Sequence, residues 1–197
     1  MVLLGRSQEA LDDLVAELGR AAVQAHAFAV DLADRDAGQL VDNKLSEIGV
    51  YCDVLVNSAG FGVFGAAAES NQKEHLKLVD VNIRALTDLT LRFLPGMIAR
   101  GRGGVLNVGS ITGYAPGPNM STYYASKAYV RSFTAALAAE VSGTGVTVTC
   151  LSPGVVRTAF FERFAVGQTR LFKLAPAPTR RKPRSPAGVA SGPGNRW

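Results

Sequence analysis

A tyrosine and a lysine four residues apart are the residues of this chain best suited to chemistry. Tyr123 and Lys127 lie in the run YYASK, in a segment that we expect to be helical, so their side chains would share one helical face. A tyrosine phenol has an ordinary pKa of about 10, which makes it a poor proton donor or acceptor near neutrality. A neighbouring ammonium favours the phenolate and should lower that pKa, which would bring Tyr123 into range for general acid–base catalysis.

A serine upstream of this pair could complete a site for an oxygen-bearing substrate. Ser110 follows a short apolar run, residues 105–109, and its hydroxyl could hold the oxygen of a carbonyl or alcohol beside the phenol. The Tyr–Lys spacing alone is a weak motif, because many such pairs are solvated helix faces. The interpretation therefore depends on the other motifs of the chain.

Three further motifs occur in order around these residues. Asn57-Ser58-Ala59-Gly60 follows an apolar strand, Val81-Asn82 is expected to open a helix, and SPGVVRT at 152–158 follows another strand. The ordered set resembles the short-chain dehydrogenase/reductase family, which comprises NAD(P)-dependent oxidoreductases built on a Rossmann-type sheet. The resemblance covers residues from about 2 to about 175.

The resemblance implies a role for each matching catalytic position. Tyr123 resembles the catalytic acid/base, and Lys127 resembles its pKa-lowering partner, which also holds the nicotinamide ribose. Ser110 resembles the substrate-orienting serine, and Asn82 the asparagine of a proton relay. Tyr124 lacks the four-residue spacing to Lys127. The implied reaction interconverts a carbonyl and an alcohol, with hydride exchanged with the cofactor and a proton with the tyrosine.

Cofactor-binding residues are expected in the loops that follow the strands. Arg6 follows the first strand, where such folds select the adenosine ribose; an arginine there can accept a 2′-phosphate, which favours NADP(H) over NAD(H). The resemblance adds a set of loop residues to Tyr123 and Lys127, namely Asp31, Asn57, Ala59, Gly60, Pro153, Gly154, Val156 and Thr158. Alternatives stay open: Arg6 could be solvated, Asp31 could cap a helix, and the Asn57 loop could be structural.

Strands alternate with helices along the chain, which predicts an α/β fold, a Rossmann-like doubly wound parallel sheet with helices on both faces. The expected strands are residues 2–4, 25–30, 53–57, 105–108 and 146–151. The expected helices run from a Ser7 cap to Gly19 and over residues 40–48, 81–100 and 121–141, with Pro95 as a candidate kink.

The N-terminal part differs from the family pattern. No stretch of the 197 residues matches the Thr-Gly-x-x-x-Gly-x-Gly turn that holds the cofactor pyrophosphate at a helix N-terminus. The first strand resembles the family's second, so we expect a partial domain, residues 1–175, truncated at its N-terminus. The strands on either side of the missing one would pair with each other or leave amides unsatisfied. A non-catalytic remnant is therefore the alternative function.

The C-terminal part is unusual in its charge. The net charge is +5, and residues 177–197 hold five of the 21 Lys and Arg residues and no acid. We expect residues 176–197 to form a basic, Pro/Gly-rich disordered tail, unlike the end of a typical family member, so a shifted reading frame or misjudged gene end is a hypothesis. Such a tail could bind an anionic surface, although a solvated tail without a nucleic-acid partner is the expectation.

The remaining composition suits a cytoplasmic enzyme. No apolar stretch approaches 18 residues, and 47% of the chain is apolar. Cys52 and Cys150 are expected to be buried thiols, and no metal site is expected; His26 and His75 are expected at the surface. The expected partners are a small carbonyl or alcohol substrate and further copies of the chain, in a homodimer or homotetramer formed through helices 82–100 and 121–141.

Overall fold

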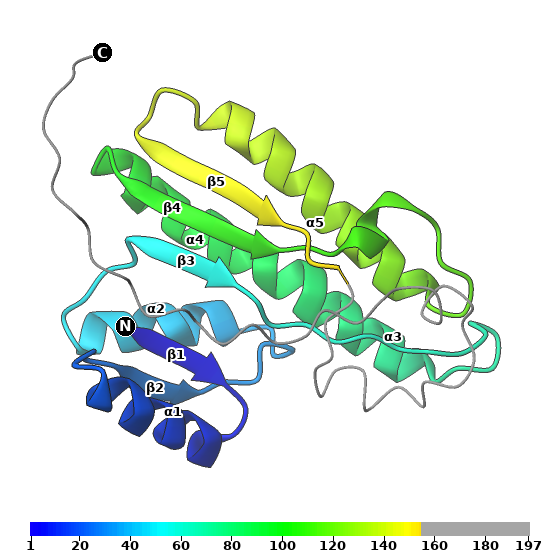
Figure 1. The fold of residues 1–197 in the computed structure, drawn as a ribbon, viewed down its shortest axis with the longest axis horizontal. Coiled ribbons are helices and arrows are strands. Elements are labelled where there is room, and N and C mark those ends of the chain that lie inside the picture. The colour runs from blue at the N-terminus through cyan, green and yellow to red at the C-terminus, as the bar shows by residue number, and fades with distance from the viewer. Residues whose placement is uncertain (155–197) are drawn as a thin grey trace, which may run out of the picture. The chain divides into compact units, whose positions relative to one another are not determined.

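The computed structural model describes residues 1–154, which form one compact unit. Strands and helices alternate along this unit (Figure 1). The strands are β1 (Val2–Gly5), β2 (His26–Ala29), β3 (Val54–Asn57), β4 (Gly103–Val108) and β5 (Val146–Leu151). The α-helices are α1 (Gln8–Arg20), α2 (Ala37–Glu47), α3 (Gln72–Val79), α4 (Leu86–Ala99) and α5 (Ser121–Glu140). The expected domain boundary at residue 175 and the tail lie outside the described residues.

The strands form two parallel sheets instead of one. β1 pairs with β2, and β3, β4 and β5 form a separate sheet in that order. The Rossmann-like α/β arrangement is confirmed, with parallel strands joined by crossover helices. Of the two alternatives for the strands beside the missing one, pairing of β1 with β3 does not occur, because neither strand lies in the other's sheet.

The outer strand of the larger sheet is exposed. Val54 and Val56 of β3 are 67% and 53% exposed, and they alternate with the buried Leu55 and Asn57. A strand this exposed can hydrogen-bond to water along its open edge. The open edge therefore costs less free energy than the buried unsatisfied amides that the sequence suggested.

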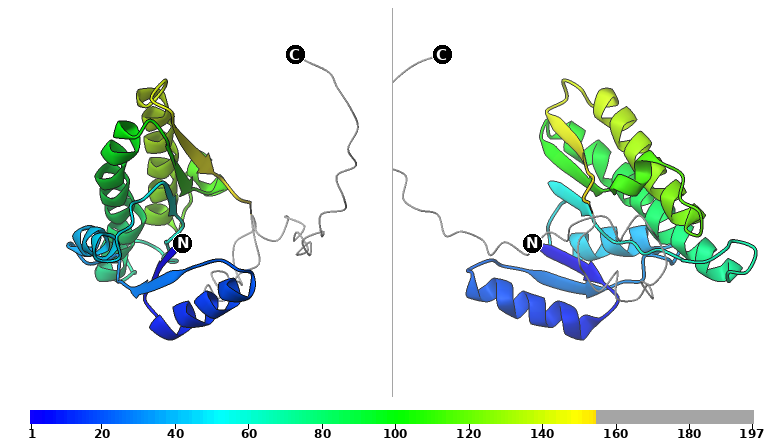
Figure 2. Two further views of the ribbon diagram at one scale, coloured as in Figure 1. Left: turned by 90° about the vertical axis from the view of Figure 1, so that its left-hand side faces the viewer. Right: turned by 45° about the vertical axis from the view of Figure 1, so that its right-hand side comes forward.

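Helices α4 and α5 lie on the same face of the three-stranded sheet (Figure 2). Their apolar side chains meet the sheet in one core that also includes residues of α2, and its buried members include Val41, Leu45, Leu55, Leu89, Met97, Val105, Leu137 and Val146. Val2, Leu4 and Phe28 of the smaller sheet pack against this core. The two sheets thus share one apolar core, to which α2 also contributes.

The helix expected at residues 81–100 begins earlier than the sequence analysis predicted. It starts at Gln72, where the Asn71 side chain accepts a hydrogen bond from the backbone N–H of Lys73 at 2.9 Å. A π-helical segment, η1 (Asp80–Ala85), joins α3 to α4, and α4 continues through Pro95 to Ala99. Asn82 therefore lies in the middle of a long helical run, in its irregular turn, and the predicted start at Val81 is wrong.

The end of α1 also differs from its prediction. Gly19 lies inside the helix, which continues to Arg20, and the left-handed conformation after it is adopted by Ala22, with a φ of 58°.

Within residues 1–154, no helix is both long and apolar enough to span a membrane.

Candidate active site

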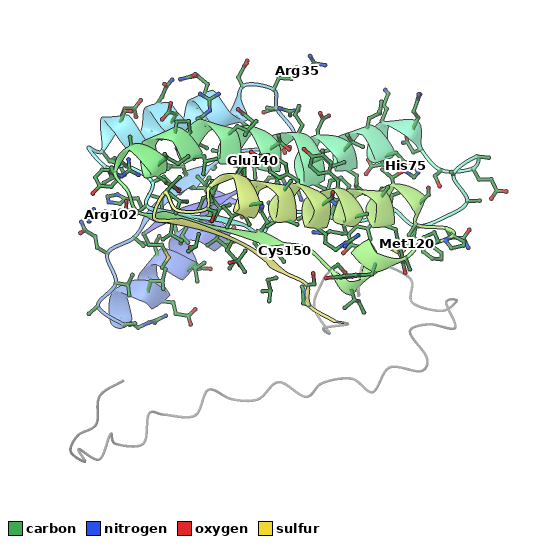
Figure 3. The ribbon with its side chains drawn as sticks, turned by 90° about the horizontal axis from the view of Figure 1, so that it is seen from above. Arg35, His75, Arg102, Met120, Glu140 and Cys150 are labelled. Atoms are coloured by element: carbon green, nitrogen blue, oxygen red, sulfur yellow. The ribbon has the colours of Figure 1, made fainter. Side chains whose placement is uncertain are left out.

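The predicted catalytic side chains gather where β4 ends and α5 begins. Figure 3 shows Met120 at the start of α5 and His75 on α3 at this end of the molecule, with Glu140 at the far end of α5. Ser110 directly follows β4 and caps a short 3-10 helix, η2 (Ile111–Tyr114), by accepting a hydrogen bond from the Thr112 N–H at 3.1 Å. This hydrogen bond holds Ser110 at the carboxyl end of β4.

Tyr123 and Lys127 occupy one buried face of α5. Each is 8% exposed, and the side chain of Ser110 forms a hydrogen bond with the Tyr123 phenol. The ring of Tyr124 lies edge-on to that of Tyr123, 6.3 Å between centroids, and packs against Gly117. The structure thus brings Ser110, Tyr123 and Lys127 together as the sequence predicted.

The electrostatics of the pair differ from the prediction. Burial raises the pKa of Tyr123, while hydrogen bonding by Ser110 and Thr112 acts in the opposite direction. The Lys127 Nζ lies 5.9 Å from the centroid of the Tyr123 ring and donates to the Val108 carbonyl at 2.8 Å. The expectation that Lys127 lowers the tyrosine pKa is therefore wrong in this state of the site, because its ammonium is directed to the backbone. Burial lowers the pKa of Lys127 itself to about 8.

Asn82 connects three elements around the site. Its Oδ1 accepts a hydrogen bond from the Phe61 N–H at 3.1 Å, and its Nδ2 donates to the Phe61 carbonyl at 2.9 Å and to the Ser126 Oγ at 3.1 Å. Ser126 in turn donates to the Tyr123 carbonyl at 2.7 Å. The side chain of Asn82 therefore ties the loop after β3 to the first turns of α5.

A second set of buried side-chain amides and hydroxyls links the strands that lead to the site with the helices that cover them. The Asn57 Nδ2 donates to the Asn107 Oδ1 at 2.9 Å and to the Thr90 Oγ1 at 3.0 Å. The Asn107 Nδ2 donates to the Thr134 Oγ1 at 3.0 Å. These four buried side chains link β3, β4, α4 and α5. The side chain of Asn57 thus has a structural role, one of the two alternatives that the sequence left open.

The ends of β1 and β2 carry the residues predicted for the adenosine end of a cofactor. Arg6 is exposed after β1, and Asp31 follows β2, where its Oδ1 accepts a hydrogen bond from the Ala33 N–H at 3.0 Å. Its Oδ2 forms an ion pair with the Lys77 Nζ of α3 at 3.1 Å. The hydrogen bond from Ala33 holds the pKa of Asp31 below its ordinary value, with further contributions from Lys77 and Arg6 and against the effect of burial.

The loops after β3 and β5 approach the same end of the sheet. A methyl group at Gly60 would lie 3.0 Å from the Asn82 Oδ1 and 3.7 Å from the Lys127 Nζ, so this loop passes close to the lysine. The Pro153 carbonyl accepts a hydrogen bond from the Ile111 N–H at 3.2 Å, which joins the loop after β5 to the loop after β4. Ala59 and Gly154 are exposed beside these contacts, whereas Val156 and Thr158 lie outside the described residues.

These residues fit the nicotinamide-ribose and adenosine ends of a dinucleotide. The Lys127 ammonium has three N–H donors, of which the structure commits one to Val108, and the glycine of the loop leaves room beside it. The adenosine end offers the exposed cation of Arg6. A glycine-rich turn for the pyrophosphate has no counterpart in the 197 residues.

Several residues of the site were missed by the sequence analysis. Ser126, Thr112 and Lys77 each support a predicted residue, and no motif distinguishes them. His75, expected at the surface, is half-buried on α3, and its Nδ1 lies 2.7 Å from the Oγ1 of Thr122, the residue before Tyr123. Its spacing on an amphipathic helix could have indicated this inward position.

The structure also describes both cysteines and the side chains that could hold a metal ion. Cys52 and Cys150 are free and half-buried, and burial raises the pKa of Cys52 to about 11. Within residues 1–154, no three His, Cys, Asp or Glu side chains come together in a way that could hold a metal ion.

Comparison with known proteins identifies relatives of the chain. The family model for short chain dehydrogenase matches residues 1–168. Sulfoacetaldehyde reductase 2 of Chromohalobacter salexigens is 36% identical over 162 residues, which cover 81% of this chain and 64% of the reductase. The NADP-dependent 3-hydroxy acid dehydrogenase YdfG of Escherichia coli is 33% identical over 159 residues, 79% of this chain and 62% of that protein. The chain thus spans less than two thirds of the length of these relatives.

Solved structures show the same resemblance. A short-chain dehydrogenase from Sphingobium yanoikuyae in complex with NADPH superposes with a TM-score of 0.77 at 30% identity, over 84% of this chain and 65% of that one. The family model, the sequence identity and the fold agree. The chain belongs to the short-chain dehydrogenase/reductase family.

Proposed function

We propose that the chain acts as an oxidoreductase that interconverts a carbonyl and an alcohol with NADP(H), and that Tyr123 exchanges the proton. The observation that carries the proposal is the group formed by the buried Tyr123 and Lys127 with the half-buried Ser110 at the carboxyl end of β4. Among the relatives, the 3-hydroxy acid dehydrogenase is named as NADP-dependent, and the Sphingobium structure holds NADPH. The exposed Arg6 at the end of β1 supports the same cofactor.

Each residue has one task in the proposed reaction. The Ser110 hydroxyl donates a hydrogen bond to the substrate oxygen, and the Tyr123 hydroxyl gives its proton to that oxygen in reduction and takes it back in oxidation. NADPH, when bound, supplies the hydride. The side chain of Asn82 is occupied by Phe61 and Ser126, so any relay role belongs to its backbone carbonyl.

Lys127 must change its contacts for the proposed proton transfer. Its ammonium donates to Val108, and the pKa of Tyr123 is raised by burial. A tyrosine with a raised pKa keeps its proton near neutrality, so little phenolate is present to act as the base, and oxidation of an alcohol requires a cation nearer to the phenol oxygen. We infer that ribose hydroxyls draw the Lys127 ammonium toward Tyr123 when the cofactor binds.

The proposal is tested by hydride transfer from NADPH deuterated at its reactive carbon to a panel of carbonyl compounds. The protein assayed is a chimera in which a β-strand and a glycine-rich turn that can hold a pyrophosphate are added before residue 1. We expect deuterated alcohol, and a loss of roughly 10²–10⁴-fold in rate for Tyr123→Phe, because the proton donor is removed while the ring remains. Tyr124→Phe is the matched control. Loss of rate in Tyr124→Phe but not in Tyr123→Phe would overturn the assignment.

A non-catalytic role for the 197 residues by themselves is the second candidate, because they include no glycine-rich turn that could hold a pyrophosphate. In that case the folded unit would retain the site without holding a dinucleotide. Calorimetric titration of NADPH into the 197-residue chain separates this candidate from the first.

We further propose that two copies of the chain associate through α4 and α5. Leu91 and Ile98 of α4 are 52% and 39% exposed. On α5, the half-buried rings of Tyr129 and Phe133 stack at 5.6 Å, and the Tyr129 hydroxyl lies 2.8 Å from the Thr87 Oγ1. Exposed apolar side chains next to stacked rings favour a protein partner on this surface.

Sedimentation velocity tests this association. We expect dimers of the wild-type chain and a shift to monomers for Leu91→Arg, because a charge would be buried at the interface. Lys73→Met, on the exposed start of α3, should leave the dimer unchanged. A wild-type chain that is monomeric at high concentration would contradict the proposal.

A further inference from the structure

The carboxyl ends of β1 and β2 place three charged side chains in one neighbourhood. Gly5 and Ala29 are register partners, and the Val30 N–H donates to the Gly5 carbonyl at 2.7 Å, so Arg6 and Asp31 follow adjacent points of the two strands. Arg6 is close enough to act electrostatically on Asp31. Lys77 reaches the same carboxylate from α3.

Lys77 and Arg6 differ in their contacts. The Lys77 Nζ lies 3.1 Å from the Asp31 Oδ2, and the two side chains are 40% and 33% exposed. Arg6 forms no hydrogen bond or ion pair within residues 1–154, so its guanidinium is available to a ligand. A ligand phosphate at Arg6 would therefore lie within range of the Asp31 carboxylate and be repelled by it.

We propose that Lys77 is a specificity-determining residue that neutralises Asp31, so that a phosphate on the adenosine 2′-position can bind at Arg6. The proposal rests on the proposed function, because it places an adenosine at the ends of β1 and β2. Without the lysine, the carboxylate and the phosphate would repel each other in a partly solvated site. Lys77 acts through Asp31, as a positioning residue, and touches no reacting atom.

The Asp31 carboxylate is fixed on its other side, so it cannot turn away. Its Oδ1 accepts the Ala33 N–H, and Arg84 holds the same loop by donating to the Ala33 carbonyl at 2.7 Å and the Asp34 carbonyl at 3.0 Å. A carboxylate held in place keeps its charge near the phosphate whether or not Lys77 is present. Neutralisation by Lys77 is therefore the means by which this loop tolerates a phosphate.

Two mononucleotides of equal charge test the proposal on the 197-residue chain. NMR titrations with 2′-AMP and with 5′-AMP at low salt measure the affinity at residues 5–8 and 29–33. Neither ligand needs a pyrophosphate site. We expect the wild-type chain to prefer 2′-AMP, Arg6→Ala to lose that preference, and Lys77→Met to weaken 2′-AMP roughly three- to tenfold more than 5′-AMP.

A second substitution distinguishes neutralisation of Asp31 by Lys77 from direct contact between Lys77 and the phosphate. Adding Asp31→Asn to Lys77→Met removes the charge that Lys77 neutralises, so we expect the double variant to regain the preference for 2′-AMP. Lys77→Arg should keep it, and Lys73→Met, on the exposed first turn of the same helix, should not alter it.

Three results would overturn the inference. Unchanged preference in Lys77→Met shows that the lysine has no part in selection. A double variant that stays impaired shows that Lys77 contacts the phosphate directly and does not act through Asp31. A wild-type chain that shows no preference for 2′-AMP, or binds neither ligand, removes the adenosine site itself, and this result counts against the proposed function as well.

Discussion

Lys127 is a buried cation whose charge is unfavourable in the folded unit. It is 8% exposed, and burial lowers its pKa from 10.5 to about 8. The unfolded chain therefore binds more protons at this residue than the folded unit does between pH 8 and 10.5. The free energy of unfolding must rise with pH across that interval, because the penalty for burying the charge disappears as the lysine loses its proton.

We expect this effect to be measurable between pH 8 and 9. The lysine alone should raise the free energy of unfolding by about 1 kcal/mol over that interval. Cys52, with a pKa raised to about 11 from 9.0, acts with the opposite sign above pH 9, as does Tyr123, whose pKa is also raised. Urea unfolding of the wild-type chain and of Lys127→Met at pH 8 and 9 gives the comparison.

The variant should lack the rise, and Lys73→Met should keep it because that side chain is exposed. An equal pH dependence in wild type and Lys127→Met would show that Lys127 is not the buried cation described by the structure.

At the scale of elements, α5 and η2 must lie close together to bring Ser110 to Tyr123. Gly113 makes the approach possible, because a Cβ there would lie 2.6 Å from the Lys127 carbonyl oxygen and 2.9 Å from its carbonyl carbon. These are backbone atoms of α5, which cannot move aside as the end of a side chain can. A side chain at position 113 would separate the serine from the helix that carries the tyrosine.

We expect Gly113→Ala to lower the free energy of unfolding by about 1–3 kcal/mol, because overpacking forces the backbone to shift. Gly19→Ala is the matched control, since Gly19 lies in α1 with no atom within 4 Å of the added methyl. That change should stabilise the chain by about 0.5–1 kcal/mol through helix propensity. Equal thermal melts for the two variants would contradict the close packing of η2 against α5.

The elements also show which parts of the site a sequence can reveal. Tyr123 and Lys127 share a helix, so their spacing alone predicts a common face. The link from Asn57 through Asn107 to Thr134 joins residues from two strands and a helix, and it depends on a register that pairs Asn57 with Asn107. Such a register is set by tertiary packing, which a single sequence does not specify.

The errors at Asn82 and Lys77 have a different cause, which is local. The start of α3 is set by the Asn71 cap, followed by Glu74 in a capping pattern, whereas the predicted helix began at Val81, beside the motif residue Asn82. Lys77 precedes that predicted start, so it was not placed on a helix facing Asp31.

In the described unit, the two sheets are joined by a common apolar core and by polar side chains instead of by a shared strand. Val41 and Leu45 of α2 enter the core beneath β3 and β4, and Lys77 and Arg84 hold the loop after β2. These contacts place Arg6 and Asp31 without any backbone hydrogen bond between the sheets. The adenosine end and the reacting end of the proposed site therefore belong to two separate sheets.

Catalysis by this family site depends on binding energy from parts of the cofactor remote from the hydride. The pyrophosphate would need amide donors at a helix N-terminus, and no glycine-rich turn among the 197 residues supplies them. The residues that suit the adenosine and nicotinamide ends of the dinucleotide would then bind it without any contact to the pyrophosphate between them. We therefore expect the chain by itself to carry the catalytic residues yet bind the cofactor poorly.

Calorimetric titration of NADPH into the 197-residue chain tests this expectation, with turnover measured on the same sample and urea unfolding used to verify that the chain is folded. We expect weak or undetectable binding by the chain alone, and saturable binding once a strand and a glycine-rich turn are added before residue 1. A micromolar dissociation constant with normal turnover from the 197 residues alone would contradict it.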